Sequence, residues 1–161
     1  MIAHNSKYPI SNGCGSNRAR YPVCASREIL AEKIRAAYQR DKPRDIWDLD
    51  QFAGRPMPEA LIRKLVVTKL WQANDVFVPD KWFEKLKQAA KWNWDDLRQL
   101  VRGTVVDPKS MLQRCTQRFT FLAQLDDDEA ALAANPRRRR VDVHKRTIEE
   151  CNRLAQERQL K

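Results

Sequence analysis

A stripe of mostly apolar residues in the segment 58–73 constrains the fold more than any other feature. The stripe repeats every three and four residues, which is the spacing of one helix face, and it consists of Ile62, Leu65, Val66, Lys69, Leu70 and Ala73. Comparable helical patterns cover residues 26–39, 43–53, 79–92, 93–103 and 108–125. No segment indicates a run of paired strands. We therefore predict an all-α bundle of about six helices over residues 26–125.

The composition supports this prediction. The chain has 161 residues and only 4 glycines, and straight side chains such as Leu, Lys, Gln and Glu lose little rotamer freedom in a helix. A chain of this length forms one ordinary domain, or most of one, and can bury a hydrophobic core.

The two ends of the chain differ from the predicted bundle. Residues 1–25 show no periodicity and contain prolines and glycines, so we expect an irregular arm. Residues 126–161 form a charged extension, in which an acidic and alanine-rich stretch is followed by four arginines and by a polar helix at about 142–159. This last helix has only a thin apolar seam, so we expect it to be exposed or loosely docked.

The chain is strongly basic, with a formal net charge of +10. Such a charge favours an anionic partner, which could be a nucleotide, an RNA or an acidic protein, although a basic surface can also serve solubility alone. The densest cluster is Arg137, Arg138, Arg139 and Arg140. It is a candidate nucleic-acid-binding segment, and an exposed linker is the alternative.

Other function classes receive no support. No apolar run approaches the roughly 20 residues of a membrane span, and the amino terminus lacks the basic start and apolar middle of a secretory signal. We therefore expect a cytoplasmic protein without membrane contact. The 4 cysteines lie far apart and form no ligand pattern, so free thiols are expected rather than disulfides or zinc.

Three charged residues are predicted to lie close together on the first two helices. Lys33 leaves the apolar face of the first helix, eight positions before a turn near Asp41, and Asp48 lies seven positions after it. Both residues are therefore at a similar height on facing helices, and Asp45 is nearer the turn. Either Lys33 and Asp48 form a structural ion pair, or Lys33 binds a polyanion beside an acid that handles a proton or a metal. Spacing does not decide between them.

The segment "REILAEKIRAAYQRDKPRDIWDL" resembles the paired late motifs of the abortive-infection nucleotidyltransferase toxins (AbiEii/AbiGii type), a branch of the polymerase-β-like nucleotidyltransferases. Lys33 occupies the position of the motif lysine, and Arg44, Asp45 and Asp48 occupy the RDxxDL motif. Trp47 stands where tyrosine is usual. The resemblance extends over about residues 23–125, so it implies the helical carboxy-terminal part of such a toxin.

The resemblance implies transfer of a nucleotide from an NTP, usually with Mg²⁺, to an RNA or protein acceptor. Lys33 would then contact the nucleotide phosphates, Asp45 would assist activation of the acceptor, and Arg44 and Asp48 would hold the site together. The candidate catalytic residues are thus Lys33, Asp45 and Asp48, and the candidate nucleotide-binding residues are Lys33 and Arg44. A lysine directed at a developing phosphate charge and a nearby carboxylate suit this chemistry. The family also implies a cognate antitoxin as a partner.

The metal-binding motifs of that superfamily are missing from this sequence. No Asp or Glu precedes Glu28, the segment "NGCGS" at 12–16 is not followed by an acidic strand, and "DLD" at 48–50 lies inside a predicted helix. We therefore expect the chain alone to lack Mg²⁺ ligands and activity, and to need a separately encoded amino-terminal half, unless it is a gene remnant. The alternative function is a non-catalytic basic helical module that binds RNA or a protein partner.

Overall fold

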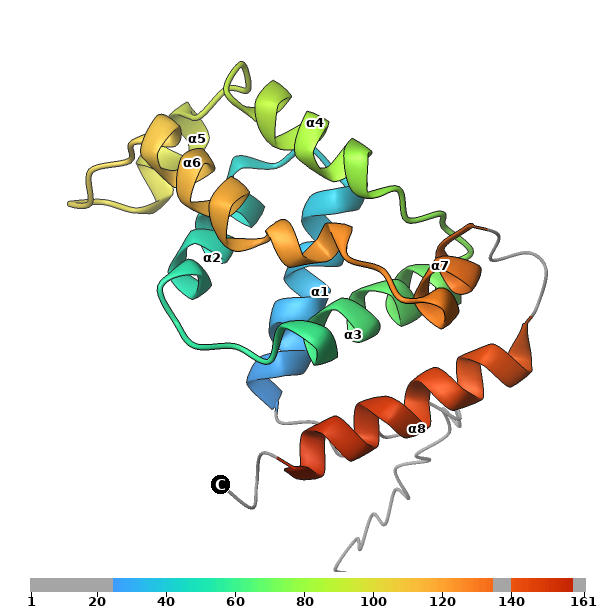
Figure 1. Ribbon diagram of the computed structural model, residues 1–161. Helices are drawn as coiled ribbons and strands as arrows, with labels where there is room; N and C mark the ends of the chain where they lie inside the picture. Colours follow the sequence, from blue (N-terminus) through green and yellow to red (C-terminus); the bar gives the residue numbers. More distant parts are fainter. Residues whose placement is uncertain (1–24, 135–139, 158–161) are drawn as a thin grey trace, which may run out of the picture.

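The computed structural model describes residues 25–134 and 140–157 (Figure 1). All regular elements within these residues are helical, which confirms the predicted all-α fold. In chain order they are α1 (Ala25–Gln39), α2 (Pro43–Ala53), α3 (Glu59–Gln72), α4 (Pro79–Ala89), α5 (Asp95–Leu100), α6 (Pro108–Arg118), the 3₁₀ turn η1 (Thr120–Ala123), α7 (Asp127–Ala134) and α8 (Val141–Glu157).

Proline and capping residues set several of these helix ends. Pro43, Pro79 and Pro108 each stand at the start of a helix, where the missing N–H costs nothing and the fixed φ suits the helix. Asp107 caps α6, since its carboxylate accepts hydrogen bonds from the N–H groups of Lys109 and Ser110 at 3.1 and 3.4 Å. The predicted starts of α2, α4 and α6 are therefore confirmed.

Helix α3 is the centre of the core. It contacts α1 on one side and α7 and α8 on another, while α2 packs on α1 and α6 (Figure 1). Because several helices surround α3, its buried residues occupy more than the predicted stripe: Leu61, Ile62, Lys64, Leu65, Val66, Val67, Thr68 and Leu70. The predicted stripe therefore included too few of the residues that α3 buries.

The predicted sixth helix, 108–125, is shorter in the structure. Helix α6 ends at Arg118 and the 3₁₀ turn η1 follows. Phe119, Phe121 and Leu122 are all at most 2% exposed, and residues at these three positions do not share one face of an α-helix. The change of helix type lets all three side chains reach the core.

The carboxy-terminal helices are more firmly docked than expected. The alanine-rich stretch forms α7, and α8 packs against both α3 and α7 (Figure 1). Helix α8 buries Val143, Thr147, Cys151 and Ala155, which recur every four residues and form one face. The contacts of α8 with α3 and α7 show that the expectation of an exposed or loosely docked helix was wrong. Because the buried residues are small or weakly apolar, the sequence carried little signal of this docking. The division of the chain at residue 126 stays a prediction.

Within residues 25–134 and 140–157, no helix combines the length and apolar character that crossing a bilayer requires. The predicted arm over residues 1–25 lies almost wholly outside the described residues, which begin with α1 at Ala25.

Candidate functional site

The antiparallel helices α1 and α2 bring Lys33 and Asp48 together. The Lys33 Nζ atom lies 2.5 Å from Asp48 Oδ2, and the two side chains are 37% and 34% exposed. Their equal distance from the turn predicted this placement. Because about a third of each side chain remains accessible, a ligand can reach the pair, and the pair is not a sealed core ion pair.

Asp45 does not join this pair. Its side chain is 1% exposed and is bound by Arg40 through two hydrogen bonds, from Nε at 2.8 Å and from Nη2 at 2.9 Å. The hydrogen bond to Asp45 and its negative charge raise the pKa of Arg40 above the ordinary value. The structure therefore places Asp45 in an enclosed bidentate contact at the hairpin turn.

Arg40 is a residue that the sequence reasoning missed. It is the residue after the end of α1 and precedes Asp45 by five positions. A basic residue at the end of one helix can meet an acid in the first turn of the next helix when only a short turn separates them. The "QRDKPRD" stretch carried this signal.

The remaining motif residue, Arg44, is exposed, and no ion pair involving it is found in the described part of the chain. Asp50, the second acid of the "DLD" segment, is bound by Arg114 of α6 at 2.7 and 2.8 Å. Asp48 and Asp50 thus face different helices, as expected for positions i and i+2 of a helix. The "DLD" segment therefore does not form a paired metal site.

Two acids of α1, Glu28 and Glu32, bind cations other than Lys33. Lys69 of α3 contacts Glu28 at 2.7 Å and Glu32 at 3.8 Å, and Arg35 donates to Glu32 at 3.1 Å. The hydrogen bond from Arg35 and the charges of Arg35 and Lys69 lower the pKa of Glu32. Lys69 is therefore held by α1 acids in a contact separate from the Lys33–Asp48 pair.

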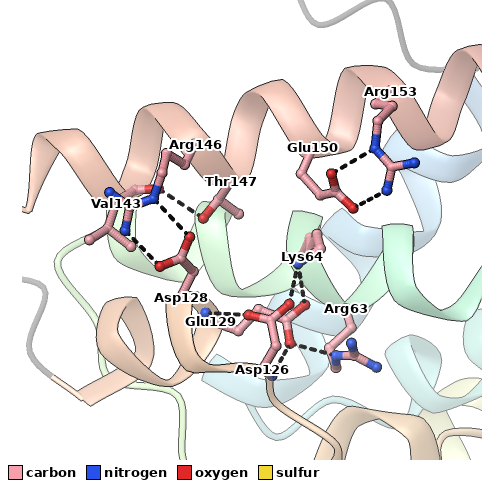
Figure 2. A network of polar contacts seen from close by, with 10 residues as sticks. All are labelled: Arg63, Lys64, Asp126, Asp128, Glu129, Val143, Arg146, Thr147, Glu150 and Arg153. Carbon is pink, nitrogen blue, oxygen red and sulfur yellow. Dashed lines mark hydrogen bonds and ion pairs between the residues drawn. The ribbon is translucent and has the colours of Figure 1, made fainter.

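A second charged cluster joins α3 to α7, and the sequence reasoning missed it entirely (Figure 2). Glu129 is fully buried; Arg63 binds it at 2.6 Å, and Lys64 Nζ lies 3.5 Å from its other oxygen. Lys64 is 6% exposed and also pairs with Asp126. Asp126 and Glu129 cap the helix reciprocally, since each carboxylate accepts the other residue's N–H at 2.8 Å. This cluster is a structural joint in which each cation faces a carboxylate.

The pKa shifts agree with the geometry of this joint. Burial disfavours the charge of Lys64, but the hydrogen bond to Asp126 and the nearby carboxylates outweigh burial and raise its pKa. Burial likewise opposes the charge of Asp126, and the bonds from Lys64 and from the Glu129 N–H lower its pKa. An acid at the N-cap with a glutamate three residues later is a capping box, so the "DDDE" segment carried the missed signal.

Of the four consecutive arginines, the structure describes Arg140. Arg137, Arg138 and Arg139 lie outside the described residues. Arg140 is exposed, and its carbonyl accepts a hydrogen bond from the His144 N–H at 2.9 Å, which begins α8. The predicted role of this segment in nucleic-acid binding stays a prediction.

The described residues do not fit a Mg²⁺ site. Residues 25–134 and 140–157 contain no group of three or more His, Cys, Asp or Glu side chains that could hold a metal ion. The carboxylates nearest the site are already occupied, Asp48 by Lys33 and Asp45 by Arg40. What the site can supply is an accessible ammonium group for an anion and a carboxylate that can accept a proton.

Comparisons with known proteins identify the family of the chain. The family model "Nucleotidyl transferase AbiEii toxin, Type IV TA system" matches residues 6–146. Among solved structures, the nucleotidyltransferase toxin MenT4 (Rv2826c) of Mycobacterium tuberculosis H37Rv is similar, with a TM-score of 0.62 and 30% identity over 81% of this chain and 46% of MenT4. The chain thus spans about half the length of that toxin. No match was found among curated proteins. The chain belongs to the AbiEii family of nucleotidyltransferase toxins of type IV toxin–antitoxin systems.

Proposed function

We propose that this chain supplies the lysine-bearing part of a nucleotidyltransferase site, which moves a nucleotide from an NTP to an RNA or protein acceptor. The observation that carries the proposal is the accessible Lys33–Asp48 pair, whose two residues lie in the segment that resembles the paired family motifs. In the reaction, an acceptor oxygen forms a bond to the α-phosphorus while the bond to the leaving pyrophosphate breaks. The cytoplasm, where NTPs are abundant, is the proposed location.

Lys33 is proposed to bind the triphosphate. Its ammonium is partly desolvated by the α1–α2 contact, and a partly desolvated cation interacts with phosphate more strongly than a fully hydrated one. Asp48 holds this ammonium in place at 2.5 Å. When the ammonium turns to the phosphates, the carboxylate of Asp48 becomes free to accept the proton of the acceptor.

Asp45 and Arg44 have different proposed roles. Because Asp45 is enclosed and bound by Arg40, it is poorly placed to accept a proton, and we propose that it positions the first turn of α2. Arg44 is exposed on the same turn and can bind a phosphate of the NTP as it enters. The division of roles within the predicted set of Lys33, Asp45 and Asp48 therefore follows accessibility.

We propose that the metal ion is bound by residues other than Lys33, Arg44, Asp45 and Asp48. The sequence contains no acid before Glu28, and the described residues lack a carboxylate cluster. Transfer would then require ligands for Mg²⁺ that these residues do not supply, and an amino-terminal half of the toxin or a partner chain would provide them. A cognate antitoxin is the second proposed partner.

The proposal is tested with the purified chain and radiolabelled NTPs. We expect NTP binding, measured by equilibrium dialysis, to weaken at least tenfold in Lys33→Ala, because one charge-assisted contact is worth about 1.5–3 kcal/mol. Lys87→Ala, an exposed lysine of α4, is the matched control. Equal NTP binding by wild type and Lys33→Ala would refute the proposal. Mg²⁺-dependent label transfer by the chain alone would show that no second chain is needed.

A second candidate is a basic helical module that binds RNA without chemistry. The net charge of +10 and the arginines at 137–140 favour it. Neutralising these four arginines should then weaken RNA binding far more than Lys33→Ala does, whereas a chemical site predicts the reverse order for growth inhibition in cells.

A further inference from the structure

A pocket of about 260 Å³ opens between α1 and the segment that joins α2 to α3. Its lining includes Leu30, Met57 and Ile62, which are buried apolar residues, and the ring of Phe52. Two arginines, Arg27 and Arg55, also line it. No carboxylate is among its described lining residues, so the pocket combines an apolar floor with uncompensated positive charge.

The pocket lies next to the Lys33–Asp48 pair. Leu30 precedes Lys33 by three residues on α1, and Phe52 follows Asp48 by four residues on α2. Residues with these spacings lie on the same side of a helix, about one turn or 5 Å apart along its axis. Since both helices step in the same direction away from the pair, the pocket continues the surface on which Lys33 is exposed.

The two arginines have unused binding capacity. The Nη1 atom of Arg27 is buried, yet it has no hydrogen-bond partner within the part of the chain that the structure describes. The guanidinium of Arg55 lies over the ring of Phe52, with Cζ 5.4 Å from the ring centroid, and the residue is exposed. A buried N–H without a partner costs stability. An anion in the pocket would remove this cost.

We propose that this pocket binds one nucleotide unit, with its phosphate on Arg27 and Arg55 and its base on the apolar floor beside Phe52. The inference rests on the proposed function and names the ligand chemistry of a neighbouring subsite. The volume of about 260 Å³ lies just under the roughly 300–1,000 Å³ of ordinary ligand pockets, so the pocket has room for at most one nucleotide unit and not for a longer segment. The nucleotide can belong to the NTP or to the 3′ end of an RNA acceptor.

Two binding measurements distinguish these sources. The purified chain is titrated with an NTP and, separately, with a short oligoribonucleotide that has a free 3′ hydroxyl. The variant pair Arg27→Gln/Arg55→Gln should weaken binding at least tenfold for the ligand that occupies the pocket. Loss with the NTP alone assigns the pocket to the NTP, and loss with the oligonucleotide alone assigns it to the acceptor.

Arg98→Gln is the matched control, because Arg98 is an exposed arginine of α5 that pairs only within its own helix, with Asp95 at 2.7 Å. If the control weakens binding as much as the pocket variants, the effect is general electrostatics and the inference is wrong. If the pocket variants bind both ligands as wild type does, the inference is also wrong, whatever Lys33→Ala does. Loss in Lys33→Ala alone supports the proposed function without this subsite.

Two further variants separate a ligand site from a structural one. Phe52→Leu keeps the apolar volume and removes the aromatic face, so it should weaken binding of the nucleotide several-fold more than it weakens binding of inorganic pyrophosphate. Arg27→Met removes the unpaired guanidinium and keeps an apolar stem, so it should leave the melting temperature unchanged or raise it while nucleotide binding falls. A lower melting temperature in Arg27→Met would mean that Arg27 is structural and would overturn the proposal.

Discussion

Arg40 binds both carboxylate oxygens of Asp45, at 2.8 and 2.9 Å, and leaves that carboxylate 1% exposed. This contact lies at the turn between α1 and α2, about one helical turn from the Lys33–Asp48 pair. It separates the acids of the RDxxDL motif into an enclosed acid and an accessible one. The predictions below follow from that separation and from the α3–α7 joint.

Replacement of Asp45 should affect stability more than its position in a motif suggests. We expect Asp45→Ala to lower the free energy of unfolding by about 2–3 kcal/mol, because it removes two charge-assisted hydrogen bonds from a buried position. Urea unfolding followed by circular dichroism measures the change. Asp80→Ala, an exposed acid in the first turn of α4, should change stability by no more than about 0.5 kcal/mol. Equal effects of the two replacements would contradict the enclosed contact.

The Lys33–Asp48 pair should contribute little to stability. Both side chains are about a third exposed, and such pairs are worth about 0–1 kcal/mol because water screens them. A double-mutant cycle of Lys33→Ala and Asp48→Ala in urea unfolding should therefore give a coupling below about 1 kcal/mol. A coupling of 3 kcal/mol or more, the size expected for a buried pair, would instead make the pair a structural one.

Glu129 should be the most sensitive acid of the α3–α7 joint. We expect Glu129→Ala to lower the free energy of unfolding by about 3–5 kcal/mol, because it leaves the buried Lys64 and the nearly buried Arg63 without their shared carboxylate. Asp127→Ala, an exposed acid in the same first turn of α7, is the control. Thermal and urea unfolding of the two variants, measured side by side, test this. A loss below about 1 kcal/mol for Glu129→Ala would show that the cluster is dispensable.

The contact of α8 with α3 should weaken in mild acid. The His144 ring stacks on Trp71 with centroids 4.4 Å apart, and burial lowers the pKa of His144 below its ordinary value of 6.5. Since the unfolded chain then binds the proton more readily, the contribution to stability is complete above pH 6.5 and is lost as the pH falls through the folded pKa. The protection factors of the α8 amides, which correct for the intrinsic slowing of exchange in acid, should therefore fall below about pH 6 in wild type.

His144→Phe provides the control for this effect, because it keeps an aromatic ring on Trp71 and cannot be protonated. The fall in α8 amide protection in acid should be smaller in this variant. An identical pH profile in wild type and His144→Phe would instead assign the effect to carboxylates of α7 and α8, such as Asp128 and Glu150. A hydrogen bond from Arg146 lowers the pKa of Asp128, and one from Arg153 lowers the pKa of Glu150.

The sequence alone determined most of the helices and the meeting of Lys33 with Asp48. Both follow from local periodicity, from proline at three helix starts and from counting residues on either side of one short turn. The family also followed from a short linear motif, because the paired motifs are contiguous in the chain. These features depend on residues that are neighbours in sequence, so no knowledge of distant contacts was needed.

Only the tertiary structure decided which charges are enclosed and which remain accessible. Lys64 meets Asp126 and Glu129 across more than 60 positions, and α8 docks through small residues that give a weak apolar signal. The pocket beside Lys33 likewise requires α1 and the α2–α3 segment to be placed together. Burial depends on what packs over a residue from elsewhere in the chain, and it is burial that separates Asp45, held by Arg40, from Asp48, which a ligand can reach.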